Sequence, residues 1–210
     1  MIALAVADLH QLLSEKAGIH AIAAHLDALD HEERERQAND LSGREQALLW
    51  EMAADGPRID LAHFVPRQRA ELEPVHHPGR NTIPTFRYFQ HFEKRFCKPR
   101  GETGRLFGYN ASNASFVHPG YFVAYDTAGH DEWADRGPVV IDYHLVPDED
   151  VPSAWPKVVP NSVGLQRLVY FRTRDFMRRV SQHVSIGRAS KEDEHGDREL
   201  DFWFTLCRRD

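Results

Sequence analysis

Asp142 and His144 are the residues in this chain whose types and spacing best suit chemistry. On a β-strand, side chains two positions apart project from the same face about 6–7 Å apart. A carboxylate and an imidazole in that arrangement can share a metal ion, a water or a substrate. His118, in a His-Pro-Gly-Tyr turn, could join them from a neighbouring strand. The alternative is that Asp142 and His144 lie on the solvent face of an antiparallel sheet, where polar side chains are expected.

The compact signatures of metal and nucleophilic sites are missing from the sequence. It contains no HExxH, CxxC or GxSxG motif, and no phosphate-binding or dinucleotide-binding glycine pattern. Cys97 lies among Lys94, Arg95 and Lys98, which could stabilise a thiolate. A cysteine beside a phenylalanine more commonly packs as a small apolar group. We expect neither a metal nor a cofactor, and the sequence leaves open whether the protein is an enzyme.

Two basic segments are interleaved with aromatic residues. Residues 87–105 hold six basic and two acidic side chains, and residues 167–188 hold six basic and one acidic. Arginine binds planar anions and stacks on rings, so a small anionic ligand is possible. Residues 126–150 hold eight acidic side chains and one basic, which favours charge matching within the fold or at an interface. The net charge of −6 makes nucleic acid the least favoured partner.

The sequence also predicts a cytoplasmic location. Residues 1–7 are apolar but lack a basic start, and Asp8 ends the run, so no signal peptide is expected. No apolar stretch approaches the roughly 20 residues of a membrane span, and we expect no membrane partner. Two cysteines, Cys97 and Cys207, fit free thiols in a reducing compartment.

Composition changes near residue 80. Residues 1–80 hold 8 basic and 14 acidic side chains but only two of the 22 aromatic residues. We therefore predict an acidic helical segment over residues 1–56, a proline-rich extended connector over residues 57–84 and a β-rich domain over residues 85–210.

The helical segment has clear start and stop signals. Apolar residues recur at helical spacing, and Ser42 with Glu45 fits a capping box. Gly56-Pro57 is expected to end the last helix of this bundle. A further helix is predicted over residues 85–96, because Phe89, Phe92 and Phe96 share one helical face.

Six strands are predicted in the β-rich domain from alternation of apolar and polar residues. The clearest ends the chain, where Leu200, Phe202, Phe204 and Leu206 alternate with more polar positions. Residues 175–184 could be either helix or strand. The fold class predicted is α+β, with a short helical bundle followed by a mainly antiparallel curved sheet or partly open barrel. The six expected strands cover residues 104–110, 121–127, 139–146, 168–173, 183–189 and 200–207.

Two functions are consistent with these patterns. The first is a non-catalytic binding or assembly protein that uses its charged and aromatic surface for a protein partner or for self-association. The second is a small-ligand-binding protein or small enzyme, with an anion- or metal-binding pocket at the mouth of the sheet. The candidate ligand-binding residues are Arg105, Tyr109, His118, Tyr121, Asp142 and His144.

Overall fold

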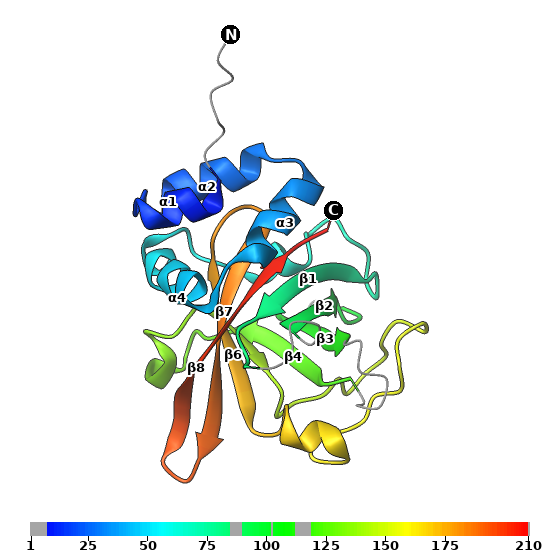
Figure 1. Cartoon of the computed structure of the whole chain (residues 1–210). Helices are drawn as coiled ribbons and strands as arrows, with labels where there is room; N and C mark the ends of the chain where they lie inside the picture. Colours follow the sequence, from blue (N-terminus) through cyan, green and yellow to red (C-terminus); the bar gives the residue numbers. More distant parts are fainter. Residues whose placement is uncertain (1–7, 85–89, 102, 112–118, 210) are drawn as a thin grey trace.

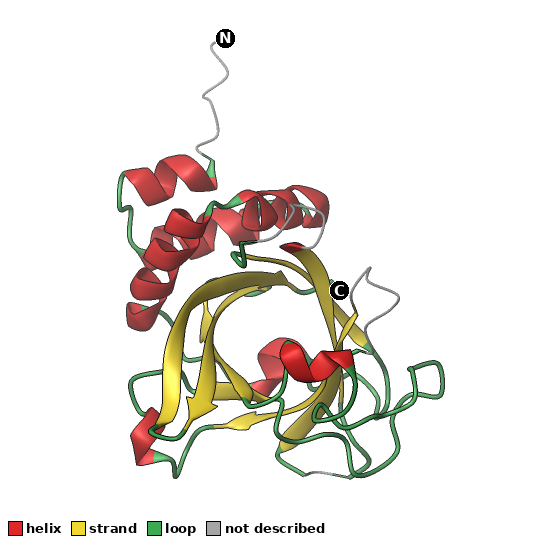
Figure 2. Ribbon diagram, turned by 60° about the horizontal axis from the view of Figure 1, so that its bottom comes forward, coloured by secondary structure: helices red, strands yellow, loops and turns green. Residues whose placement is uncertain are grey.

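A set of short helices leads into a closed eight-stranded antiparallel barrel (Figure 1). The structure is a computed structural model and describes residues 8–84, 90–101, 103–111 and 119–209. In Figure 2 the strands form a ring and the helices lie against one side of it. The α+β class and the antiparallel sheet predicted from the sequence are confirmed.

Most of the described α-helices begin at side-chain caps that are visible in the sequence, whereas α2 begins after Gly18, which has none. Asp8, Asp30 and Ser42 each accept a hydrogen bond from the backbone three residues on. Ser42 and Glu45 form the predicted capping box. No helix in the described ranges is long and apolar enough to cross a membrane. The α-helices are α1 (Leu9–Ser14), α2 (Ile19–Ala28), α3 (His31–Asp40), α4 (Gly43–Met52) and α5 (Leu61–Phe64).

Each strand of the barrel pairs with the next strand along the chain, and β1 pairs with β8 to close the ring. Gly79 of β1 stands opposite Leu206 of β8 in this closing pair. Short 3-10 helices, η1 (Ala53–Asp55), η2 (Asp131–Trp133) and η3 (Leu165–Leu168), lie in the connections. The strands are β1 (Val75–Asn81), β2 (His91–Cys97), β3 (Arg105–Ala111), β4 (Tyr121–Asp126), β5 (Val139–Asp142), β6 (Thr173–Arg179), β7 (Val184–Asp193) and β8 (Gly196–Cys207).

The barrel has two more strands than the sequence predicted, and it is closed rather than partly open. Residues 75–81, expected within the connector, form β1 despite Pro78. The pairing of β1 with β8 begins only at Gly79, so the missing N–H of Pro78 interrupts no bond on that side.

Three further segments differ from the sequence prediction. Residues 91–97, expected to be helical, form strand β2, while residues 85–89 of that expected helix lie outside the described part. The strand expected over residues 168–173 is not formed: Leu168 ends η3, residues 169–172 form a turn, and β6 starts at Thr173. Residues 175–179, left open between helix and strand, belong to β6.

Alternation along the strands separates an interior from an outer face. Interior positions include Phe96, Leu106, Phe122, Ile141 and Met177, which form one apolar cluster. On the outer face of β5 to β8, a second cluster joins the barrel to the helices through Leu26, Leu49, Trp50, Phe176 and Ile186. Each helix is too short to be stable alone, so this packing stabilises the bundle.

One end of the barrel is closed by α5. Phe64 packs on Phe96 of β2, with ring centroids 5.0 Å apart. Its backbone carbonyl is 2.9 Å from Nε2 of the buried His77, and Arg208 donates to the carbonyl of His63. Burial lowers the pKa of His77 to about 3, so this imidazole is neutral near pH 7. We call the opposite end, where strands β1, β3 and β5 end, the mouth.

Interior glycines make room for aromatic rings. A Cβ on Gly187 would lie 2.2 Å from the Phe204 ring, and one on Gly108 would lie 2.4 Å from the Phe122 ring. These positions let large rings cross a narrow barrel without empty space.

Replacing Gly187 by Ala should therefore strain the interior. We expect Gly187→Ala to lower the free energy of unfolding by about 1–3 kcal/mol, as overpacked cores do. Urea unfolding followed by circular dichroism measures the change. Gly43→Ala is the control, because the nearest atoms to its new Cβ are 3.6 Å away. It should stay within about 0.5 kcal/mol of the parent. Equal stability of both variants would contradict the packing described here.

Candidate functional site

Asp142 and His144 lie together on the outer side of the barrel, but not on one strand face as predicted: the strand expected over residues 139–146 ends at Asp142, and His144 lies in the turn that follows β5. The Asp142 carboxylate is 2.7 Å from His144 Nδ1 and also accepts the backbone N–H of His144. Its other oxygen accepts hydrogen bonds from Tyr125 Oη and from Arg174 Nε. Asp142 is only 2% exposed, so it is not a solvent-facing carboxylate.

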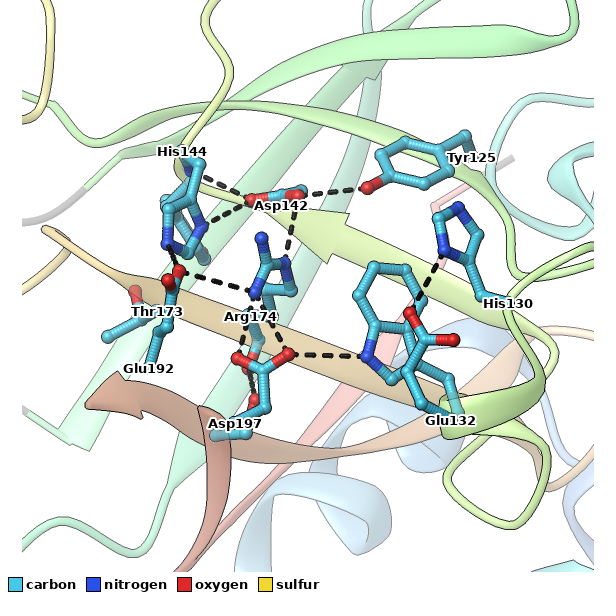
Figure 3. Close-up of polar contacts among 12 residues, drawn as sticks. Tyr125, His130, Glu132, Asp142, His144, Thr173, Arg174, Glu192 and Asp197 are labelled. Carbon is cyan, nitrogen blue, oxygen red and sulfur yellow. Dashed lines mark hydrogen bonds and ion pairs between the residues drawn. The ribbon is translucent and has the colours of Figure 1, made fainter. Parts of the chain in front are cut away.

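These residues form part of a larger charged network (Figure 3). Arg174 also pairs with Asp197, and His144 Nε2 lies 2.7 Å from Glu192. Burial raises the pKa of Asp142, but hydrogen bonds from His144 and the charge of Arg174 lower it overall. Each charge has an opposite neighbour, and the network joins β5 and β6 to the β7–β8 hairpin. This arrangement has the features of a structural network that holds these strands together.

The other residues proposed from the sequence lie elsewhere and do not converge on Asp142. Tyr109 and Tyr121 stack on the outer face beside Trp155, with the two tyrosine rings 5.3 Å apart. Arg105 is paired with Asp148 and Glu149. His118 lies outside the described residues.

A second polar cluster, not proposed from the sequence, lies inside the barrel around Lys94. The Lys94 ammonium donates to Asn110 Oδ1 at 2.9 Å and to Asp175 Oδ2 at 3.0 Å. It also donates to Tyr143 Oη, which in turn accepts from Asn110 and donates to Asp175. We call these four residues the Lys94 cluster. They come from β2, β3, β6 and the residue that follows β5.

Aromatic rings surround the Lys94 ammonium. Its nitrogen lies 4.8–5.4 Å from the ring centroids of Phe92, Phe122, Tyr143 and Phe204. Such distances permit cation–π attraction, which partly compensates for lost hydration.

Burial shifts the pKa values of the ionisable residues in the Lys94 cluster. It lowers the pKa of Lys94 and raises the pKa of Asp175, and their mutual attraction opposes both shifts. Burial also raises the pKa of Tyr143, which therefore keeps its proton. The pair can hold its shared proton on either partner more easily than an exposed pair could.

The mouth is covered by a segment that belongs to no strand. Tyr170 stacks on Tyr143 with ring centroids 5.2 Å apart, and its ring occupies the space where Gly120 has no side chain. Figure 2 is turned so that this end comes forward, and a short helical segment lies across the ring of strands there. We call residues 163–172, which include η3, the mouth loop. Its outer surface exposes Val163, Leu165, Leu168 and Val169.

The sequence contained a signal for the Lys94 cluster that was easily misread. Lys94 stands between Phe92 and Phe96 at a spacing of two, the spacing of one face of a strand. The helix predicted over residues 85–96 from its phenylalanine spacing includes Lys94, and a lysine is a weak signal for an interior position because charged side chains are almost never fully buried unless paired. Its partner Asp175 is 81 positions away along the chain.

Other hollows in the described surface are bordered in part by charges that pair with each other. One of 940 Å³ lies beside α3 and is bordered by Glu35 and Arg209, which pair with each other. Within the described ranges, no group of three or more histidine, cysteine or carboxylate side chains is arranged to hold a metal ion. Cys97 and Cys207 are buried free thiols, and burial raises the pKa of Cys97 to about 12, which disfavours a thiolate nucleophile.

Comparison of the chain with family models, with curated proteins and with solved structures gives no match. Its function is therefore argued from the geometry of the Lys94 cluster.

Removing one member of the buried ion pair should lower the free energy of unfolding more than neutralising both members does. Lys94→Met leaves the Asp175 carboxylate without its cation, which we expect to lower the free energy of unfolding by about 3–5 kcal/mol at pH 7. The double variant K94M/D175N should recover most of this loss. Chemical unfolding of both variants from pH 5 to pH 8 measures the difference.

The pH dependence identifies the cause. In Lys94→Met the folded-state pKa of Asp175 is raised above its unfolded value, so the folded state binds more protons and its stability falls as pH rises. The gap between single and double variants should therefore shrink at pH 5. If the difference in stability between the two variants did not change with pH, the single variant would not contain a buried carboxylate without a partner.

Proposed function

We propose that this protein binds a small, uncharged and largely apolar molecule at the mouth of the barrel, through an oxygen atom that accepts a hydrogen bond from Lys94. The supporting observation is the Lys94–Asp175 ion pair, held in an aromatic interior with Lys94 only 2% exposed.

The energetic cost of this pair supports a functional role. Burying two charges costs several kcal/mol each in desolvation, and apolar residues of similar size commonly do as well or better for stability. Ionisable groups with strongly perturbed pKa values concentrate at functional sites. Barrel interiors of eight strands can hold one small ligand.

The charges of the Lys94 cluster limit the chemistry of the ligand. Because Asp175 already balances Lys94, a second buried negative charge would be uncompensated. A carbonyl or hydroxyl oxygen can accept from the ammonium without adding charge if it takes the place of Asn110 Oδ1, because Asn110, Tyr143 and Asp175 together accept from all three N–H groups of Lys94. The rings of Phe92, Phe122 and Phe204 offer apolar contact to the rest of the molecule.

The mouth loop provides a route for entry. Tyr170 comes from this loop and not from a strand, so moving its ring vacates the space beside Tyr143 without breaking the sheet. The exposed apolar side chains of the loop give an apolar molecule its first contact.

Binding of a neutral aromatic ketone tests this proposal. Prodan, a naphthyl ketone whose emission shifts to the blue in apolar surroundings, should bind saturably at one site. K94M/D175N should weaken binding about tenfold or more, since a hydrogen bond from a charged donor contributes about 1.5–3 kcal/mol. Tyr170→Ala should bind at least as tightly as the parent.

Lys157→Met is the matched control, because Lys157 is an exposed lysine outside the cluster. It should bind prodan as the parent does. An unchanged affinity in K94M/D175N, with the fold intact by circular dichroism, would refute the proposal.

Self-association through the mouth loop is a second candidate function, favoured by its four exposed apolar side chains. Leu168 is 77% exposed and Val163 56%, on a loop that a second copy could cover. This function predicts a particle heavier than one chain in light scattering. L165D/L168D should then reduce the mass to one chain, whereas Leu145→Asp, at another exposed apolar residue, should not. A parent protein that is already monomeric at high concentration would exclude this function.

A further inference from the structure

We propose that Lys94 forms a covalent imine with a ligand that carries an aldehyde or ketone carbonyl. This inference rests on the proposed function, since the carbonyl oxygen that accepts from Lys94 brings its carbon close to the amine nitrogen. It assigns to the Lys94 cluster a substrate class and a reaction.

The Lys94 cluster contains the groups that imine formation requires. The Lys94 ammonium must lose a proton before its nitrogen can attack a carbonyl carbon. Asp175 Oδ2 lies 3.0 Å from that nitrogen and can accept the proton. Tyr143 Oη is hydrogen-bonded to the same nitrogen and carries a proton that it can donate. Burial favours the neutral forms of both Lys94 and Asp175.

The reaction balances with these residues alone. The Lys94 ammonium gives one proton to Asp175, and the free amine attacks the carbonyl carbon, forming the C–N bond while the C=O π electrons move to oxygen. Tyr143 gives its proton to that oxygen and takes one from the nitrogen, so that a neutral carbinolamine results. The nitrogen lone pair then expels the hydroxyl group, which takes the proton from Asp175 and leaves as water.

The product is a protonated imine beside a restored Asp175 carboxylate. The cation on nitrogen occupies the place of the original ammonium among the same four rings. Because these rings exclude water, hydrolysis of the imine is slowed. Asn110, which donates to Tyr143 Oη and accepts from Lys94, acts as a positioning residue.

Lys94 differs in environment from the four other lysines of the chain. Lys16, Lys157 and Lys191 are exposed, and Lys98 donates to two backbone carbonyls at the protein surface. Lys94 instead donates hydrogen bonds to both a carboxylate and a phenol inside the barrel. We therefore expect an aldehyde to react selectively with Lys94.

Reductive trapping tests the inference. The full chain is incubated at neutral pH with 6-methoxy-2-naphthaldehyde and sodium cyanoborohydride, which converts an imine into a stable secondary amine. Peptide mass mapping then measures labelling at each lysine. Lys94 should be labelled about tenfold faster than any other lysine, as expected for a positioned nucleophile. The same protein unfolded in urea should lose this preference.

Variants separate the roles of the residues. Asp175→Asn and Tyr143→Phe should each slow labelling of Lys94, because each removes a proton acceptor or donor. Lys94→Arg keeps a positive charge without an amine that can form this imine, and it should leave the remaining four lysines labelled as before. Lys157→Met should leave labelling of Lys94 unchanged.

The outcomes distinguish this inference from the proposed function. If prodan binds through Lys94 but the aldehyde labels exposed lysines as fast as Lys94, the inference is wrong and the binding function stands. If neither probe reaches Lys94 in the folded protein, both are wrong. Preferential labelling of Lys94 that is lost in Asp175→Asn supports both.

Discussion

Pairing of β1 with β8 is the interaction on which the rest of the structure depends. It removes both free edges of the sheet and divides the strand residues into an enclosed interior and an outer face. Gly79 makes this closure possible, because a Cβ there would lie 2.3 Å from the Thr205 carbonyl oxygen and 2.8 Å from the Leu206 side chain. Without closure, the face that carries Lys94 would be open to water, and neither its altered titration nor its aromatic surroundings would follow.

The two charged clusters also determine the register of the barrel. Arg174 and Asp175 are neighbours in β6, yet Arg174 lies in the outer network with Asp142, and Asp175 lies inside with Lys94. A slip of one residue in β6 would exchange them and leave both clusters with like charges or missing partners. The outer network adds to this effect by tying the β7–β8 hairpin to β5 and β6. By holding this register, the outer network also keeps Asp175 inside the barrel beside Lys94.

Local patterns predicted those parts of the fold where alternation is uninterrupted. The strands around Ile141 and Phe204 and the capping box at Ser42 were predicted because each depends on neighbours within a few residues. Strand β2 was not, since Lys94 interrupts its apolar alternation and its phenylalanines also fit a helical spacing. Closure of the barrel and the pairing of Lys94 with Asp175 both join residues far apart in sequence. A single sequence contains no direct signal for either contact.

The interior is polarised along the barrel axis, and this polarity bears on how a ligand must enter. Towards α5 the interior is filled mainly by apolar side chains such as Phe64, Phe96 and Leu206, with the neutral His77 among them. Towards the mouth lie Asn110, Tyr143 and Asp175, with Lys94 between the two regions. In the proposed function, a molecule that enters past Tyr170 would meet the ammonium with its leading atom, and the filled end would stop it from going deeper. Its oxygen would lead, and its apolar remainder would stay beside Tyr143 and the apolar side chains of the mouth loop. A charged group in the leading position would leave water without finding an unpaired partner, so we expect a neutral oxygen at the leading end.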